Sequence, residues 1–108
     1  MIKKYNKLFL FDIDGTLYDN DKREVPLSTK EALVELKKHS HIGIATGRAE
    51  FMLYSISYVI DLFDDFVLIN GQYIKSDSEV VYKSPIDPLL LEKLVKQMEE
   101  LDIAYGFE

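Results

Sequence analysis

Two aspartates, Asp12 and Asp14, stand one residue apart directly after a short apolar run in the segment FLFDIDGT. The run from Leu8 to Phe11 is too short for a helix, and it predicts a strand covered on both faces, as in a parallel sheet. Side chains alternate along a strand, so both carboxylates would point the same way. Neighbouring carboxylates repel, and a divalent cation or a shared proton relieves that repulsion. The alternative is an ordinary turn made by Asp and Gly.

A second apolar run also ends in polar residues. Residues 41–48 read HIGIATGR, which predicts a strand from Ile42 to Ala45, followed by a polar tip and a helix over residues 49–58. The Thr46 hydroxyl could donate to a phosphate, and the start of the helix would add N–H groups and the positive end of its dipole. The alternative is that Thr46 only caps the helix. Arg48 could contact a phosphate or be solvated at the helix start.

The segments around these two tips predict how the tips are positioned. A capping box at Ser28-Thr29-Lys30-Glu31 predicts a helix between the two strands, and such a crossover makes the strands parallel. Their carboxyl ends would then share the sheet edge at which open α/β sheets bind ligands. A third strand is expected from Phe66 to Ile69, where Asn70-Gly71 favours a tight turn.

The remaining third of the sequence predicts a hairpin and another helix. Residues 72–83 alternate as two strands joined at Ser76-Asp77-Ser78. Asp87 and Pro88 then suit a helix start, and the apolar side chains that follow recur at the spacing of an ordinary core face. We expect a last strand over residues 103–107.

The segment from Leu8 to Leu17, with Asp12-Ile13-Asp14-Gly15-Thr16 at its centre, closely resembles the first signature of the haloacid dehalogenase superfamily, which consists mostly of phosphatases. The resemblance implies that Asp12 is a nucleophile that becomes an aspartyl phosphate and that Asp14 is the general acid and base. Thr46 matches the second signature, a Ser or Thr at the end of the second strand. The polar stretch from Leu17 to Pro26 fits the flap of the family, where Tyr18, Asp19 and Asn20 either touch substrate or are solvated.

The same resemblance implies an α/β fold: a HAD-like three-layer α/β/α arrangement around a Rossmann-type parallel sheet, with the start of an α/β cap. An Asn-Gly pair after the third strand, followed by a hairpin, is similar to the Cof-type sugar-phosphate phosphatases, whose cap follows that strand. Residues 1–71 are therefore expected to form the amino-terminal portion of the core, and residues 72–108 the beginning of the cap. Asn70 would face the active site.

The expected chemistry is a magnesium-dependent transfer of a phosphoryl group to Asp12. Mg²⁺ is a hard cation that binds one or two carboxylates together with phosphate oxygens and waters, so Asp12 and Asp14 are its expected ligands. Amides in a turn can bind an anion. The expected phosphate-binding residues are Gly15, Thr16, Thr46 and Gly47, with Arg48 and Asn70 as weaker substrate contacts.

Two signatures of the superfamily have no match in the sequence. They are a Lys or Arg that steadies the phosphate and an acidic pair in the pattern G-D-x-x-x-D, and no Gly-Asp occurs in the 108 residues. Asp61, Asp64 and Asp65 precede the third strand, so they would lie at the opposite end of the sheet. We therefore expect the amino-terminal part of a larger enzyme. The alternative is a non-catalytic binding or interaction module, whereas a phosphoacceptor receiver domain does not fit D-I-D-G-T.

Composition narrows the range of partners and compartments. The chain has 108 residues, 47% of them hydrophobic, which suits about one small domain. Its net charge of −6 argues against a nucleic-acid partner. The expected partner, a small phosphorylated metabolite, must then be drawn by local amides and Mg²⁺ rather than by the overall field. The absence of cysteine favours the cytoplasm, and no apolar run or signal peptide predicts contact with a membrane. An uncovered sheet edge would favour self-association.

Overall fold

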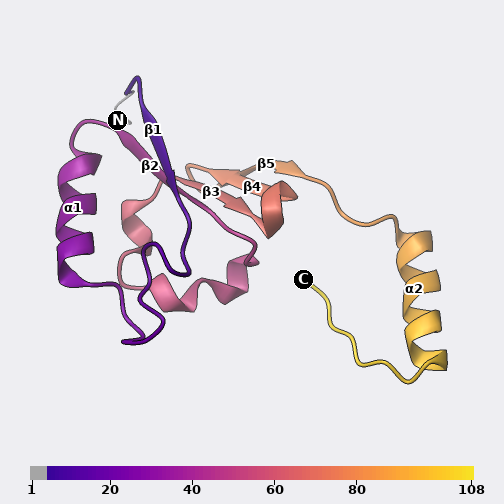
Figure 1. Cartoon of the computed structure of the whole chain (residues 1–108). Helices are drawn as coiled ribbons and strands as arrows, with labels where there is room; N and C mark the ends of the chain where they lie inside the picture. The colour runs from indigo at the N-terminus through magenta and orange to yellow at the C-terminus, as the bar shows by residue number, and fades with distance from the viewer. Residues whose placement is uncertain (1–4) are drawn as a thin grey trace.

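The fold is a five-stranded sheet with helices joined to it (Figure 1), as seen in a computed structural model that describes residues 5–108. The strands follow one another in the order β1 (Leu8–Phe11), β2 (His41–Ala45), β3 (Asp65–Leu68), β4 (Tyr73–Ser76) and β5 (Glu79–Lys83). The helices are α1 (Leu27–Lys37), α2 (Pro88–Glu100) and three 3₁₀ segments, η1 (Glu50–Ile56), η2 (Ile60–Leu62) and η3 (Ile69–Gly71). The predicted α/β class is confirmed.

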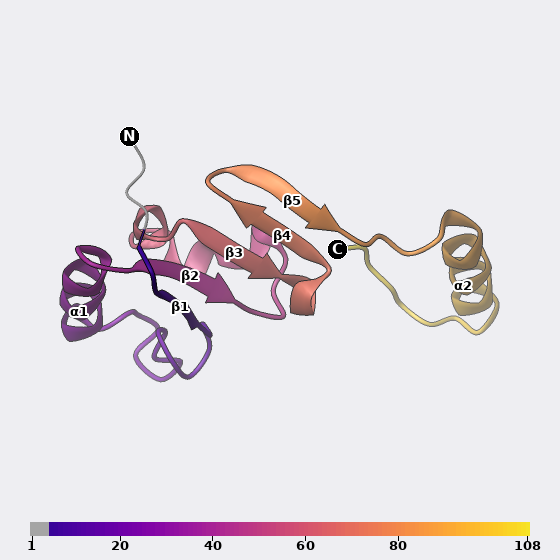
Figure 2. The ribbon, with the colours of Figure 1, turned by 90° about the horizontal axis from the view of Figure 1, so that it is seen from above.

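Strands β1, β2 and β3 are parallel, as the crossover helix predicts. Phe11 pairs with Ile44, and Ile44 pairs with Phe66, so the three strands end close together. Figure 2 shows these arrows side by side, pointing in the same direction. The residues that follow each strand therefore lie along one edge of the sheet, and this edge carries the candidate site.

The hairpin β4–β5 continues this sheet in antiparallel fashion, so the sheet as a whole is mixed. Asp77 and Ser78 join the two strands with φ angles of 49° and 67°. Two consecutive positive φ angles are what a two-residue hairpin turn of type I′ requires. The predicted hairpin is confirmed, and β4 pairs with β3. The assignment of residues 72–108 to a cap stays a prediction.

The core is made of apolar residues from the strands and the segments that join them. Its fully buried members are Ile13, Ile42, Ile44, Ile56 and Leu68, all at 0% exposure. Helix α1, which connects β1 to β2, contacts both β2 and η2, the short segment before β3. Ile13 is notable because it separates the two aspartates in sequence, and its burial fixes the chain where Asp12 and Asp14 emerge.

Three details of the local elements differ from the predictions. Helix α1 begins at Leu27 after Pro26, and no side chain caps it. The predicted capping box is wrong because Ser28 already lies inside the first turn. The helix expected over residues 49–58 is the 3₁₀ segment η1, and residues 103–107 form no strand.

Strand β1 is not covered on both faces in the part of the chain that the structure describes. Leu8, Phe9 and Leu10 are 50%, 41% and 47% exposed. Within residues 5–108, β1 pairs with β2 alone, so it is an edge strand and its apolar side chains have little to pack against. The expected self-association through this edge stays a prediction.

Helix α2 projects away from the sheet in both views (Figures 1 and 2). Asp87 caps its first turn by accepting a hydrogen bond of 2.8 Å from the Leu89 N–H, as predicted. The expected core face is not formed, however, because no α2 residue is buried. The radius of gyration is 17.1 Å, against about 13 Å for a compact chain of this length. Among the described helices, none has the length and apolarity needed to cross a bilayer.

Candidate active site

The end of β1, the end of β2 and the turn η3 surround a cavity of about 410 Å³. Its polar lining residues are Asp12, Thr46 and Asn70, which are far apart in the sequence. Gly47 and Gly71 complete the polar side, and Ala45 and Val67 form the floor. The structure thus brings together four of the predicted site residues: Asp12, Thr46, Gly47 and Asn70.

Asp12 is exposed at the carboxyl end of β1, where a solute can reach it. Its Oδ1 accepts a hydrogen bond of 2.8 Å from the N–H of Ile13. Since a carboxylate has several acceptor positions, one bond orients the group without using up its oxygens. Asp12 can therefore approach a bound anion or a cation through the remaining oxygen.

Thr46 is held firmly at the end of β2 and is 7% exposed. Its N–H donates to the carbonyl of Val67 over 2.9 Å, which extends the pairing of β2 and β3 by one residue. Its Oγ1 accepts a hydrogen bond of 3.1 Å from the Arg48 N–H. A threonine hydroxyl also has one hydrogen to donate, and that hydrogen remains for a ligand in the cavity.

Asn70 reaches the cavity through a strained turn. Ile69 and Asn70 have φ angles of 49° and 53°, in the left-handed region, which is unusual for a β-branched residue such as Ile69. Two hydrogen bonds of 3.1 Å hold the turn, from the Ile69 N–H to the Arg48 carbonyl and from the Asn70 N–H to the Thr46 carbonyl. Such strain, about 1–3 kcal/mol per residue, persists where the surroundings fix the backbone.

Gly47 provides the room that the Asn70 side chain occupies. A Cβ atom added at Gly47 would lie 3.1 Å from the Asn70 Oδ1, closer than ordinary contacts. Gly47 therefore matters here for the space it leaves beside the amide. The two residues define one wall of the cavity.

Arg48 binds the carboxylate of Asp14 with both sides of its guanidinium. Its Nε donates to Oδ2 over 2.9 Å and its Nη2 donates to Oδ1 over 2.8 Å. The third nitrogen, Nη1, donates to the Met52 carbonyl of η1 over 2.7 Å, and the guanidinium lies 5.8 Å from the centre of the Tyr54 ring. This arrangement ties the loop after β1 to the tip of β2 and to η1.

The pairing changes the electrostatics of both groups. The hydrogen bonds from Arg48 hold the pKa of Asp14 below its usual value, against a smaller opposing effect of burial. Asp14 in turn raises the pKa of Arg48, chiefly through the same hydrogen bonds. The pairing therefore favours the ionised form of Asp14, which has no proton to donate.

Gly15 and Thr16 lie away from the cavity that contains Asp12. They line a separate hollow with the loop residues Tyr18, Asp19 and Asn20. Their amides are engaged inside the loop, from the Gly15 N–H to the Tyr18 carbonyl over 3.1 Å and from the Thr16 N–H to the Ile13 carbonyl over 3.2 Å. Phosphate binding by these two residues stays a prediction, and their amides would first have to leave these partners.

The helix start expected to assist Thr46 is also absent from the site. Segment η1 is a short 3₁₀ helix that begins at Glu50, beyond Arg48, and no side chain caps it. A helical dipole at Thr46 therefore does not contribute, because the residues between Thr46 and Glu50 are not helical. The side-chain donors that line the cavity at this tip are instead the Thr46 hydroxyl and the Asn70 amide.

Asp64 and Asp65 lie where the sequence predicts, at the amino end of the parallel strands. Asp64 contacts Lys37 and His41 at the start of β2, each over 3.7 Å. Asp65 is the first residue of β3, and the carboxyl end of that strand is three residues further on. These carboxylates cannot complete a metal site with Asp12.

The described residues offer part of a magnesium site. Within residues 5–108 there is no group of three or more His, Cys, Asp or Glu side chains placed to hold a metal ion. Asp12 presents an exposed carboxylate, whereas both oxygens of Asp14 are already bonded to Arg48. Mg²⁺ retains several waters and binds substrate phosphate, so the exposed Asp12 carboxylate suits it as one ligand, and the expected role of Asp14 as a second ligand stays a prediction.

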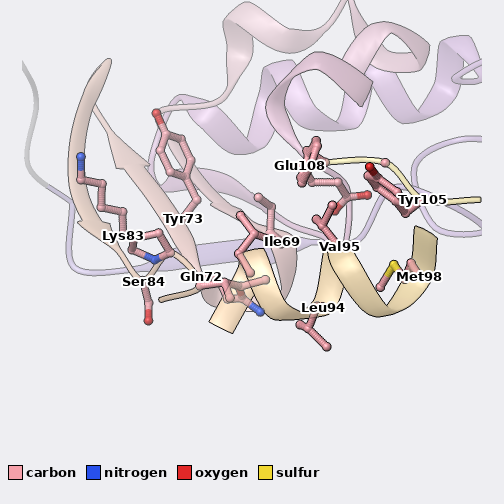
Figure 3. A pocket seen from close by; sticks show the side chains of 15 residues that line it. Ile69, Gln72, Tyr73, Lys83, Ser84, Leu94, Val95, Met98, Tyr105 and Glu108 are labelled. Carbon is pink, nitrogen blue, oxygen red and sulfur yellow. The ribbon is translucent and has the colours of Figure 1, made fainter. Parts of the chain in front are cut away.

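A larger cavity, of about 560 Å³, lies between the hairpin, α2 and the last residues of the chain (Figure 3). Leu94, Val95 and Met98 of α2 line it together with Ile69 and Tyr73. Its lining is mostly apolar and has no pair of carboxylates. The polar groups that suit phosphate chemistry converge at Asp12, and we place the candidate site there.

Comparison with known proteins identifies the family. The profile of the haloacid dehalogenase-like hydrolases matches residues 9–108, nearly the whole chain. The chain belongs to this family. The predicted resemblance is therefore confirmed, and with it the HAD-like fold.

Relatives within the family are named as phosphatases. YkrA of Bacillus subtilis (strain 168), whose name proposes a phosphatase activity, is 38% identical over 96 residues, which are 88% of this chain and 37% of YkrA. A hypothetical protein from Geobacillus kaustophilus HTA426 superposes with a TM-score of 0.81 at 39% identity, covering 89% of this chain and 37% of that one. The HAD subclass IIB sugar phosphatase BT4131 gives 0.74 at 32% identity, covering 89% and 38%. The chain thus spans little more than a third of the length of these relatives.

Sequence reasoning missed the pairing of Arg48 with Asp14 and the support that Met52 and Tyr54 give it. It assigned Arg48 to a substrate contact or to the helix start, and the substrate contact stays a prediction. A signal was available, because the two tips follow adjacent parallel strands and carry opposite charges. The pairing matters because Asp14 is the residue that the family resemblance predicts to be the general acid and base.

Proposed function

We propose that this chain carries the nucleophile of a magnesium-dependent phosphatase that acts on a small phosphorylated metabolite through a phosphoaspartate at Asp12. The observation that supports it best is the convergence of Asp12, Thr46 and Asn70 on one cavity at the carboxyl edge of the parallel strands. A nucleophilic carboxylate beside hydroxyl and amide donors is what phosphoryl transfer requires. The family and the phosphatase relatives agree with this reaction class.

The reaction would proceed in two displacements at phosphorus. In the first, an Asp12 carboxylate oxygen bonds to phosphorus, the bond from phosphorus to the alcohol oxygen breaks, and Asp14 gives a proton to that oxygen. In the second, a water oxygen bonds to phosphorus, Asp14 takes a proton from that water, and the bond from phosphorus to the Asp12 oxygen breaks, which releases inorganic phosphate and restores the Asp12 carboxylate. Mg²⁺ bound at Asp12 would neutralise the charge of the reacting anions.

Each donor in the cavity has a part in this scheme. The Thr46 hydroxyl and the Asn70 amide would bind the phosphoryl oxygens, and the Gly47 position keeps the Asn70 amide in place. The lowered pKa of Asp14 favours its carboxylate form, which suits the second displacement, in which Asp14 accepts a proton. The first displacement needs Asp14 protonated, so the two steps place opposite demands on its pairing with Arg48.

For the substrate we propose a phosphorylated sugar or a similar small alcohol phosphate. The support is the similarity to BT4131, which is named as a sugar phosphatase. The net charge of −6 disfavours attraction of an anion at long range, so local donors must bind it. We place the reaction in the cytoplasm, as the lack of cysteine favours.

A second candidate is a non-catalytic module that keeps the fold. The observation that favours it is the partial metal site, since residues 5–108 hold no group of three metal-binding side chains. Such a module would bind a phosphorylated ligand at the Asp12 cavity without turning it over.

Release of phosphate from p-nitrophenyl phosphate with Mg²⁺ distinguishes the two candidates. We would assay both this chain and the complete product of the gene that encodes it. The phosphatase predicts turnover that Asp12→Asn abolishes, whereas Asp102→Asn, an equally conservative change at an exposed residue far along the chain, leaves it intact. Binding of the ester without turnover by the complete product supports the module, and full activity of Asp12→Asn rules out the proposed nucleophile.

A further inference from the structure

The side chain of Arg48 is fixed along its whole length. Two nitrogens bond to Asp14 over 2.8 and 2.9 Å, and the third bonds to the Met52 carbonyl over 2.7 Å. The side chain is 20% exposed, and its charged end lies against the Tyr54 ring. An arginine that serves a bound phosphate would keep its planar fork open to the cavity, but this fork is already occupied by a carboxylate.

The backbone of Arg48 is fixed as well. Its N–H donates to the Thr46 Oγ1 and its carbonyl accepts from the Ile69 N–H, each over 3.1 Å. Arg48 therefore connects three parts of the site: the phosphate-binding tip of β2, the strained turn that carries Asn70, and the segment η1. The Asp14 carboxylate, which is bonded to the guanidinium, is therefore held in a fixed position relative to these three parts.

Asp14, by contrast, has little support of its own. It lies in the loop after β1 with 42% of its side chain exposed. Among the described residues, Arg48 is the one side chain that bonds to its carboxylate. Without the fork, the carboxylate would be free to rotate among its rotamers, and a proton-transferring group must lie within about 2.6–3.2 Å of its target.

We propose that Arg48 is the positioning residue that fixes the Asp14 carboxylate for proton transfer to the leaving group, and that it does not act as a ligand of the substrate phosphate. This inference rests on the phosphatase function proposed above. It predicts a dependence on the leaving group. An alkoxide is strongly basic and needs the proton from Asp14, whereas nitrophenolate leaves readily without it.

The test compares an alkyl phosphate, glycerol 2-phosphate, with p-nitrophenyl phosphate in the complete product of the gene. Arg48→Lys keeps the charge and loses the planar fork. We expect kcat/KM, which reports the first displacement alone, to fall at least about tenfold on the alkyl phosphate, within the contribution of a general acid, and by less than about threefold on p-nitrophenyl phosphate. The double variant Arg48→Lys/Asp14→Asn should be no slower than Asp14→Asn, because both changes remove the same proton transfer.

A control variant, Lys75→Met, breaks a different ion pair, from Lys75 to Glu50 over 2.8 Å, and should leave the ratio of the two activities unchanged. A rise in KM with kcat preserved in Arg48→Lys would show a phosphate ligand and overturn the inference. Equal losses of kcat/KM on both substrates, or losses that add to those of Asp14→Asn, also overturn it. If Asp12→Asn retains activity, or the unmodified protein has none, the proposed function itself fails; if only the leaving-group pattern is missing, the role of Arg48 alone fails.

Discussion

The guanidinium of Arg48 and the carboxylate of Asp14 form a two-point hydrogen bond, 2.8 and 2.9 Å long, between the loop after β1 and the tip of β2. The two residues are 34 positions apart in the sequence. Since adjacent parallel strands end side by side, charges placed just after each strand meet across the gap. This contact ties the loop after β1 to the tip of β2.

The first prediction concerns stability and pH. The pKa of Asp14 is lowered in the folded protein by Arg48, so the pairing stabilises the fold above the unfolded value of about 3.9 and is lost as pH falls below it. Because Asp14 is 42% exposed, we expect less than about 1 kcal/mol. Thermal unfolding from pH 7 to pH 3 measures this. The difference in melting temperature between the unmodified chain and Asp14→Asn should shrink below pH 4, and parallel curves would contradict the pairing.

The second prediction concerns the space beside Asn70. Gly47→Ala would place a methyl group 3.1 Å from the Asn70 Oδ1 and displace the amide from the cavity. A displacement of about 1 Å can cost up to about 100-fold in rate, so we expect phosphate release to fall by about 10- to 100-fold. Gly106→Ala is the matched control, because nothing lies within 4 Å of its added Cβ. Unchanged activity in Gly47→Ala would show that the Asn70 amide does not bind the phosphate.

The third prediction separates the side chain of Asn70 from its backbone. Asn70 has a φ of 53°, which glycine adopts freely and alanine adopts at a cost of about 1 kcal/mol. Asn70→Gly and Asn70→Ala should lose phosphate affinity equally, since both lack the amide. Only Asn70→Ala should lose stability in urea unfolding. Wild-type affinity for phosphate in Asn70→Gly, measured by calorimetry, would show that the turn and not the amide matters.

The fourth prediction concerns the metal. Chelation with EDTA should stop phosphate release by the complete gene product, and Mg²⁺ should restore it. Ca²⁺ should restore much less, because it prefers six to eight ligands at longer distances. Full turnover in EDTA would contradict the proposed metal dependence.

The catalytic edge could be predicted from the sequence because strand ends are well marked. Apolar runs of four or five residues end at Asp12 and Thr46, and the crossover between them dictates parallel pairing. Asn70 follows a third such run, although that strand ends at Leu68, one residue earlier than expected. Short-range patterns were sufficient for these positions.

Other features depend on packing that local patterns do not encode. Leu8 to Leu10 predict burial by composition, but within residues 5–108 the only strand paired with β1 is β2, so they stay exposed. The apolar side chains at helical spacing on α2 predict a core face, but no α2 residue is buried, and these side chains line an open cavity. The bond from Arg48 to Asp14 joins residues on different elements, and only the register of β1 and β2 brings them together.

The central claim is that Asp12 is the nucleophile, and trapping the intermediate tests it most directly. The complete gene product would be mixed with substrate and Mg²⁺, quenched in acid and reduced with borohydride, which converts an aspartyl phosphate to homoserine. Mass spectrometry of the peptide containing residues 8–22 should show homoserine at position 12 and none in Asp12→Asn. Phosphate release without modification at position 12, or with homoserine at another aspartate, would contradict the account.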